Sequence, residues 1–255
     1  MTETPRRLVG KTALVTCGSR GLGAAIAERL ATEGAAVCIA DRLIDDATAH
    51  ADTLSGRGLD VTAIKVDLTD LDAIGGMVDH VIGWRDGLDI LVNNAGVAAA
   101  DSLLDASPAD WDLQLAVNLR APFFASQAAA RHMVERRSGK IVNAVSTSGF
   151  SSSSTPAPIY DLTKGGIRQM TISTAVELAP LGINVNGVAP GTIGTDLTYA
   201  VLDTPEKMAR AGSRIPCGAL GQPSDIAAAV AYLSSSDADY VFGHVLVVDG
   251  GWLAI

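Results

Sequence analysis

The stretch Thr12-Ala-Leu-Val-Thr-Cys-Gly-Ser-Arg-Gly-Leu-Gly23 decides the fold of this chain. Its apolar first half predicts a buried strand, and a helical pattern follows its glycine-rich second half. Glycines at such a junction let backbone N–H groups at a helix N-terminus approach a pyrophosphate. An ordinary glycine-rich turn is the alternative, but this one joins a strand to a helix. We expect a cofactor to contact Gly18, Ser19, Arg20, Gly21, Leu22 and Gly23.

Short apolar runs and longer helical patterns alternate along the rest of the chain. The alternation predicts an α/β fold with a parallel sheet and right-handed crossovers. No linker or repeat interrupts it, so we expect one domain over residues 1–255. The seven runs are Thr12–Cys17, Ala36–Ala40, Val61–Val66, Leu88–Val92, Lys140–Val145, Ile183–Val188 and His244–Val248.

Composition restricts the class of protein. The chain has 255 residues, 48% of them hydrophobic, and its net charge is −9, from 19 basic and 28 acidic residues. The acidic balance disfavours nucleic acid as a partner. Three scattered cysteines, with no apolar signal segment and no run long enough to span a bilayer, predict a cytoplasmic protein with reduced thiols and no membrane contact. We expect no metal.

The second strand ends at Asp41, eighteen residues after Gly23 (41 − 23). An acidic residue at this point can bind the adenosine ribose hydroxyls, and it repels a 2′-phosphate. We therefore expect NAD rather than NADP. Arg20 and Arg42 favour NADP instead, because either could pair with the phosphate. A solvated loop acid is the alternative for Asp41.

Tyr160 and Lys164 lie four residues apart, which places them on one face of a helix. A tyrosine ionises near pH ~10, and a neighbouring ammonium favours the phenolate. The pair is therefore a candidate general acid and base, although this spacing alone is common.

A helix is predicted to begin at Ser107, with Pro108 in its first turn. Pro122 lies inside this helix and has no N–H, so the carbonyl of Asn118 loses its helical partner. That carbonyl could hold an ordered water. A simple bend of a long helix is the alternative.

Several segments in this order resemble the short-chain dehydrogenase/reductase family over essentially the whole length. They are Thr16–Gly23, Asp67-Leu68, Asn93-Asn94-Ala95-Gly96, Asn118, Ile141–Ser146, Tyr160 with Lys164, Pro190–Thr195 and Val248–Gly251. The resemblance implies a doubly wound Rossmann-type parallel seven-stranded sheet with helices on both faces.

The resemblance also implies hydride transfer between a carbinol carbon and nicotinamide. Asn118, Ser146, Tyr160 and Lys164 match the catalytic tetrad, in which the asparagine carbonyl holds a relay water. Further cofactor contacts implied by the family motifs are Asp67, Leu68, Asn94, Ala95, Gly96, Pro190, Gly191, Ile193 and Thr195, together with Tyr160 and Lys164.

Two departures from the family pattern stand out. Cys17 replaces the first glycine of the loop, and we expect Gly18 to absorb the backbone strain. A thiol near a helix N-terminus can have a lowered pKa and react readily, whereas an inert core thiol is the alternative. Ser146 lies 14 residues before Tyr160 (160 − 146), a longer gap than usual, which leaves Ser148 as a second candidate.

The sequence specifies the substrate less closely than it specifies the cofactor. We expect contacts from Ser146, Ser148, Ile159, Tyr160 and Thr192, and a lid at about 192–217. No charged residue occurs from Ser146 to Tyr160, which favours a neutral secondary alcohol or ketone: a sugar or polyol, an alicyclic ketone or a hydroxysteroid.

Two other functions stay open. One is an NADPH-dependent 3-oxoacyl-carrier-protein reductase, for which Arg136 and Arg137 could dock an acidic carrier. However, Leu181 stands where such reductases often carry an arginine. The other is a non-catalytic dinucleotide-binding protein. The resemblance further implies a homotetramer formed through the long helices and the C-terminal strand.

Overall fold

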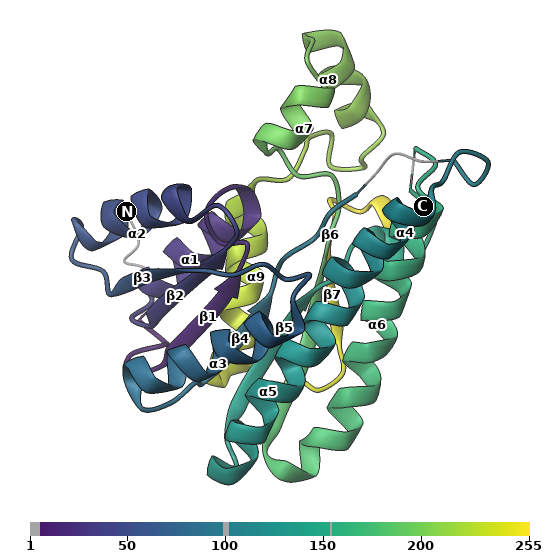
Figure 1. Ribbon diagram of the computed structural model, residues 1–255. Coiled ribbons are helices and arrows are strands. Elements are labelled where there is room, and N and C mark those ends of the chain that lie inside the picture. The colour runs from purple at the N-terminus through teal and green to yellow at the C-terminus, as the bar shows by residue number, and fades with distance from the viewer. Residues whose placement is uncertain (1–5, 99–101, 154) are drawn as a thin grey trace.

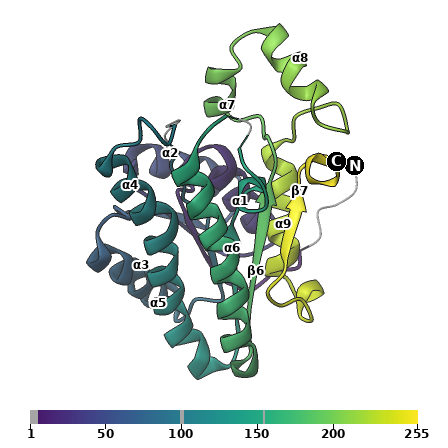
Figure 2. The same ribbon diagram turned by 90° about the vertical axis from the view of Figure 1, so that its right-hand side faces the viewer.

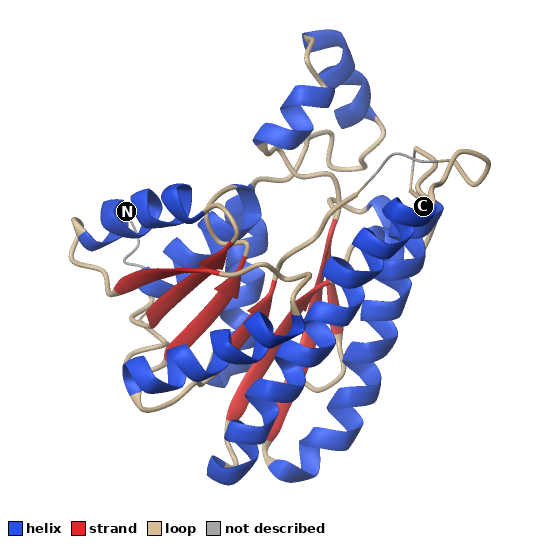
Figure 3. Cartoon of the chain, in the orientation of Figure 1, coloured by secondary structure: helices blue, strands red, loops and turns tan. Residues whose placement is uncertain are grey.

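Seven parallel strands form one sheet in the order β3-β2-β1-β4-β5-β6-β7 (Figures 1 and 3). The computed structural model describes residues 6–98, 102–153 and 155–255, so residues 1–5, 99–101 and 154 of the predicted domain lie outside the described residues. The strands are β1 Thr12–Thr16, β2 Ala36–Asp41, β3 Val61–Lys65, β4 Ile90–Asn93, β5 Gly139–Ala144, β6 Ile183–Pro190 and β7 Val245–Val248. The predicted fold class is confirmed, and each strand end lies within two residues of the prediction.

Helices cover both faces of the sheet (Figure 1). One face carries α1 (Gly21–Thr32), α2 (Ile44–Ser55) and α9 (Pro223–Ser234). The other carries α3 (Leu71–Arg85), α5 (Ala121–Arg136) and α6 (Pro158–Leu178). Each face has its own apolar core, so the strands are buried on both sides, which explains their nearly continuous apolar sequences.

The strand order reverses at β1, because β2 and β3 lie on one side of it and β4 to β7 on the other. In open parallel sheets a ligand binds outside the carboxyl ends of the strands at this switch point. The helices α7 (Asp196–Val201) and α8 (Pro205–Ser213) project from the body above this edge (Figures 1 and 2). They occupy most of the segment that was predicted as a lid.

The helix that the sequence predicts from Ser107 is divided in three. Ser107 caps α4 (Pro108–Leu115) by accepting a hydrogen bond from Asp110 N at 3.1 Å. A π-helical turn, Ala116–Arg120, then precedes α5. The interruption falls immediately before Pro122, as its missing N–H predicts. None of the helices described has the length and apolar character to cross a membrane.

Candidate active site

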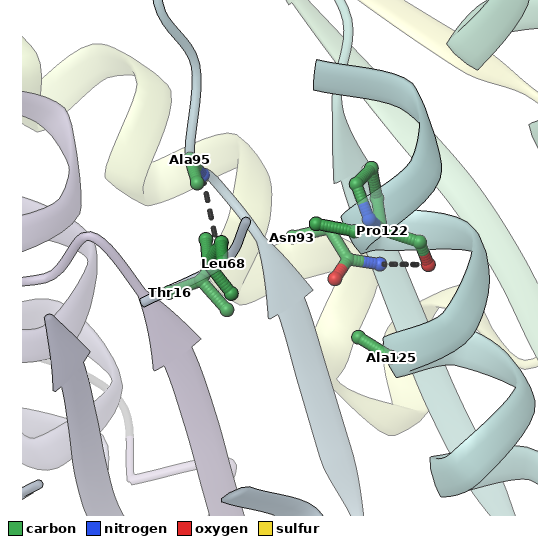
Figure 4. Close-up of a pocket in the computed structure, with 7 residues that line it drawn as sticks. Thr16, Leu68, Asn93, Ala95, Pro122 and Ala125 are labelled. Atoms are coloured by element: carbon green, nitrogen blue, oxygen red, sulfur yellow. Dashed lines mark hydrogen bonds between the residues drawn. The ribbon is translucent and has the colours of Figure 1, made fainter. Parts of the chain in front are cut away.

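The glycine loop is tied to the end of β4 through Thr16. Its Oγ1 accepts hydrogen bonds from the backbone N–H groups of Asn94 at 3.0 Å and Ala95 at 3.1 Å. Figure 4 shows the bond from Ala95. The Asn94 side chain donates in return to the carbonyls of Thr16 at 3.0 Å and Cys17 at 3.2 Å. The two loops flanking the switch point are therefore held as one unit.

A buried polar contact supports this unit from β5. Asn93 Nδ2 donates to Asn143 Oδ1 at 2.8 Å. It also lies 3.5 Å from the Pro122 carbonyl (Figure 4). Thr16, Asn93 and Pro122 line a small cavity of about 10 Å³ between β1, β4 and α5. That volume is close to the space of one water molecule.

The residues of the glycine loop fit the diphosphate of a dinucleotide. Ser19 Oγ is buried and lacks a hydrogen-bond partner among the described residues. Arg20 precedes α1 without a side-chain cap, so the first N–H groups of this helix stay open to an anion. A Cβ on Gly23 would collide with the Cys17 carbonyl, and Gly21 has a φ of +57°. Both positions therefore require glycine.

Tyr160 and Lys164 project from the first turns of α6. The Lys164 ammonium lies 5.5 Å from the centre of the Tyr160 ring and donates to the Ala144 carbonyl at 2.8 Å. Lys164 is 4% exposed, and burial lowers its pKa to about 8. A Cβ on Gly96 would be 3.5 Å from Lys164 Nζ, so the loop after β4 lies beside the ammonium.

The pKa of Tyr160 differs from the sequence-based expectation. Burial raises it, the nearby Ser146 hydroxyl offsets part of the shift, and the charge of Asp161 raises it further. The expectation that Lys164 already lowers this pKa is wrong for the protein without cofactor. The physical reason is that desolvation of the phenol dominates, while Lys164 is directed at the Ala144 carbonyl.

Asn118 lies in the π-helical turn and is 1% exposed. Its side chain accepts from Val97 N and donates to Val97 O, both at 2.8 Å, and donates to Thr163 Oγ1 at 3.1 Å. These bonds fix the turn against the loop after Gly96 and against α6. The structure thus places all four predicted catalytic residues around one point at the carboxyl edge.

Comparison with known proteins agrees with this geometry. A family model described as enoyl-(acyl carrier protein) reductase, one of the short-chain dehydrogenase/reductase models, matches residues 17–253. The chain belongs to the short-chain dehydrogenase/reductase family. It is an oxidoreductase that interconverts a secondary alcohol and a ketone with a nicotinamide dinucleotide.

Three proteins illustrate the similarity. The 3-oxoacyl-[acyl-carrier-protein] reductase FabG of Aquifex aeolicus is 39% identical, over 96% of this chain and 98% of that protein. The 5-keto-D-gluconate 5-reductase of Escherichia coli is 35% identical, over 96% of both chains. The crystal structure of a gluconate 5-dehydrogenase from Burkholderia cenocepacia in complex with NADP and tartrate is 34% identical. The superposition covers 99% of this chain and 98% of that chain, with a TM-score of 0.92.

The residues predicted to contact the adenosine half of the cofactor lie at the ends of β2 and β3. Asp41 is 6% exposed, and its carboxylate accepts from the backbone N–H of Ser19 at 3.1 Å and of Leu43 at 3.0 Å. Arg42 is exposed beside it. Farther along the edge, the Asp67 carboxylate accepts from Thr69 N at 2.9 Å, and Leu68 is buried.

The remaining predicted contacts follow the end of β6. Pro190 ends the strand, and a Cβ on Gly191 would be 2.7 Å from the Asp249 Cα. Thr192 is exposed and Ile193 is buried. Thr195 caps α7.

Most of the residues predicted to contact the substrate lie in the turn after β5 and in α6. Ser146 caps a 3₁₀ turn, Thr147–Gly149, by accepting from Ser148 N at 3.1 Å. Ile159 is buried in the first turn of α6. The described residues contain no cluster of three His, Cys, Asp or Glu side chains that could hold a metal ion.

Sequence reasoning missed the supporting roles of Thr16 and Thr163. Both are small hydroxyl residues beside recognised motifs, at a strand end and one residue before Lys164. A β-branched residue at either place equally predicts packing, so the pattern did not single out their hydrogen bonds.

Two expectations about the loop at Cys17 are wrong. Cys17 itself has a φ of +50°, whereas Gly18 lies outside the left-handed region, so Gly18 does not absorb the strain. Burial, followed by the charge of Asp41, raises the pKa of the Cys17 thiol to about 12. The expectation of a readily reactive thiol is therefore wrong, and the inert alternative fits.

Alkylation tests this assignment. With iodoacetamide at pH 7.5, the exposed Cys217 should be labelled at least about ten-fold faster than Cys17, because a half-buried thiol with a raised pKa supplies little thiolate. Peptide mass spectrometry over time measures both rates. A Cys217→Ser variant should leave the slow Cys17 rate unchanged, and equal labelling of the two residues would contradict the assignment.

Proposed function

We propose that this enzyme acts on a secondary hydroxyl or keto group of a small polyhydroxylated molecule, a sugar, polyol or sugar acid. The observation that carries the proposal is the uncharged, hydroxyl-bearing turn beside Tyr160, in which Ser146 and Ser148 are half-buried. Two proteins similar to this chain are named for gluconate or ketogluconate as substrate, and one was crystallised with tartrate.

In the proposed reaction the site would hold a nicotinamide dinucleotide, which would supply the chemistry of hydride transfer. Tyr160 takes the alcohol proton in oxidation and returns one in reduction. Ser146 donates to the reacting oxygen and fixes its position. With the cofactor bound, Lys164 would hold its ribose and favour the phenolate, and Asn118 would present its carbonyl for a relay water.

For the cofactor we propose NAD over NADP. A 2′-phosphate would meet the Asp41 carboxylate, which two backbone N–H groups fix in place. The Burkholderia structure contains NADP, and the exposed Arg20 and Arg42 are the residues of this chain that could pair with its 2′-phosphate. Asp41 outweighs Arg42 in our proposal, because Arg42 is exposed and its charge is screened by solvent.

A 3-oxoacyl-carrier-protein reductase is the second candidate, supported by the similarity to the Aquifex enzyme. Such an enzyme docks an acidic carrier on basic residues. The two arginines suggested by the sequence are already engaged: Arg136 pairs with Asp89 at 3.1 Å, and Arg137 donates to the Pro180 carbonyl at 3.0 Å. A non-catalytic role is disfavoured by the complete tetrad.

We also propose a cytoplasmic homotetramer. A groove of about 1150 Å³ on α4, α5 and α6 is flanked by partly exposed Leu113, Phe123 and Phe124. Exposed apolar side chains beside a groove of this volume favour a subunit interface. Strand β7 is an edge of the sheet and ends close to the exposed Ile255, which offers a second interface.

The function is tested with a panel of alcohols followed at 340 nm. We expect turnover of polyols or sugar acids to exceed that of cyclic alcohols, steroids and acyl thioesters. The Tyr160→Phe variant should keep cofactor binding, measured by calorimetry, and lose at least about 100-fold in kcat, because only the proton-transfer group is removed. Near-full activity of this variant would refute the role of Tyr160.

The cofactor proposal is tested with Asp41→Asn, which removes the charge and keeps one backbone contact. The ratio of kcat/KM for NAD to that for NADP should fall at least about ten-fold, because repulsion of the 2′-phosphate is lost. Asp45→Asn, an exposed acid on α2, is the charge-matched control and should leave the ratio unchanged. A wild-type preference for NADP would overturn the proposal.

A further inference from the structure

A carboxylate next to Tyr160 holds the chain that follows Ser146. Asp161, in the first turn of α6, accepts two hydrogen bonds from Ser153, from its backbone N–H at 3.0 Å and from its hydroxyl at 2.5 Å. The Ser153 hydroxyl also lies 2.8 Å from the Ser148 hydroxyl. A continuous chain of hydrogen bonds therefore runs from Asp161 to Ser148.

The chemistry of Asp161 fixes the direction of this chain. An ionised carboxylate only accepts hydrogen bonds, so the Ser153 hydroxyl must give its proton to Asp161. The Ser153 oxygen is then available only as an acceptor, and the proton between the two serines must come from Ser148. Because its proton is donated to Ser153, the Ser148 hydroxyl can accept a further hydrogen bond but cannot donate one.

Ser146 has the opposite character. Its oxygen accepts from Ser148 N at 3.1 Å, and its hydroxyl bonds to Tyr160, so its own proton is directed to the place where the reacting oxygen would lie. The turn carrying both serines is fixed in place, because a Cβ on Gly149 would be 2.8 Å from the Lys164 carbonyl. A hydrogen-bond donor and an acceptor thus lie two residues apart beside Tyr160.

We propose that Ser148, held by Ser153 and Asp161, accepts a hydrogen bond from a substrate hydroxyl on the carbon next to the reacting one. Ser146 donates to the reacting oxygen, and Ser148 receives the neighbouring O–H. The enzyme therefore selects vicinal diols in oxidation and α-hydroxy ketones in reduction. Ser148 is a specificity residue, and Ser153 and Asp161 are positioning residues. The inference rests on the proposed function and narrows its substrate class.

The test compares cis-1,2-cyclohexanediol with cyclohexanol, which differ by the neighbouring hydroxyl. The readout is the ratio of kcat/KM for the diol to that for the mono-alcohol, so general losses of activity cancel. The wild-type ratio should be at least about ten, and Ser148→Ala should lower it at least about five-fold.

The positioning residues are tested with the same ratio. Ser153→Ala should lower it as well, because the Ser148 proton loses its acceptor, whereas Ser153→Thr keeps a hydroxyl and should restore it. Ser151→Ala is the matched control, since Ser151 is exposed on the same segment and should leave the ratio within about two-fold of the wild type. Thermal melting at a fixed protein concentration confirms that each variant is folded.

Both alcohols are also titrated calorimetrically into the enzyme with NAD⁺ present. A wild-type ratio near one, or an unchanged ratio in Ser148→Ala, overturns the inference while leaving the proposed function intact. Absence of turnover for every alcohol on the panel would instead refute the proposed function. In that case the calorimetric affinities still decide the inference. A preference for the diol that is lost in Ser148→Ala supports it, and a preference that Ser148→Ala retains overturns it.

Discussion

The active site depends on a lysine ammonium that the fold holds away from water. A buried cation is costly unless fixed oxygen atoms surround it, and burial lowers the pKa of Lys164 to about 8. Its hydrogen bond to the Ala144 carbonyl ties α6 to the end of β5. The turn that carries Ser146 leaves from this same strand end, so the acid–base residue and the oxygen donor are placed by one contact.

The cofactor side is organised by the strand order. Because the strand order reverses at β1, the loops after β1 and β4 meet, and Thr16 with Asn94 joins them through hydrogen bonds. Gly96 then brings the second loop beside Lys164. Three segments therefore meet at the carboxyl edge of the sheet: the glycine loop, the loop after β4 and the start of α6. A dinucleotide and an alcohol can lie together there.

The fold could be predicted from the sequence, because strands buried on both faces require apolar runs and the family motifs give their order. The placement of the tetrad followed from the same motifs. The pKa of the Cys17 thiol and that of Tyr160 could not be predicted, since both depend on burial, which residue spacing does not show. The Ser153–Asp161 contact joins a residue before α6 to one in its first turn, eight positions later, and no periodic pattern predicts such a contact.

The central claim is that Tyr160 is a proton-transfer group whose pKa depends on what is bound beside it. Phenolate absorbance near 295 nm, recorded against pH as the difference between wild type and Tyr160→Phe, measures this pKa directly. It should lie above the usual ~10 in the free protein and fall below it with NAD⁺, whose positive ring favours the phenolate. A pKa that NAD⁺ leaves unchanged would contradict the account.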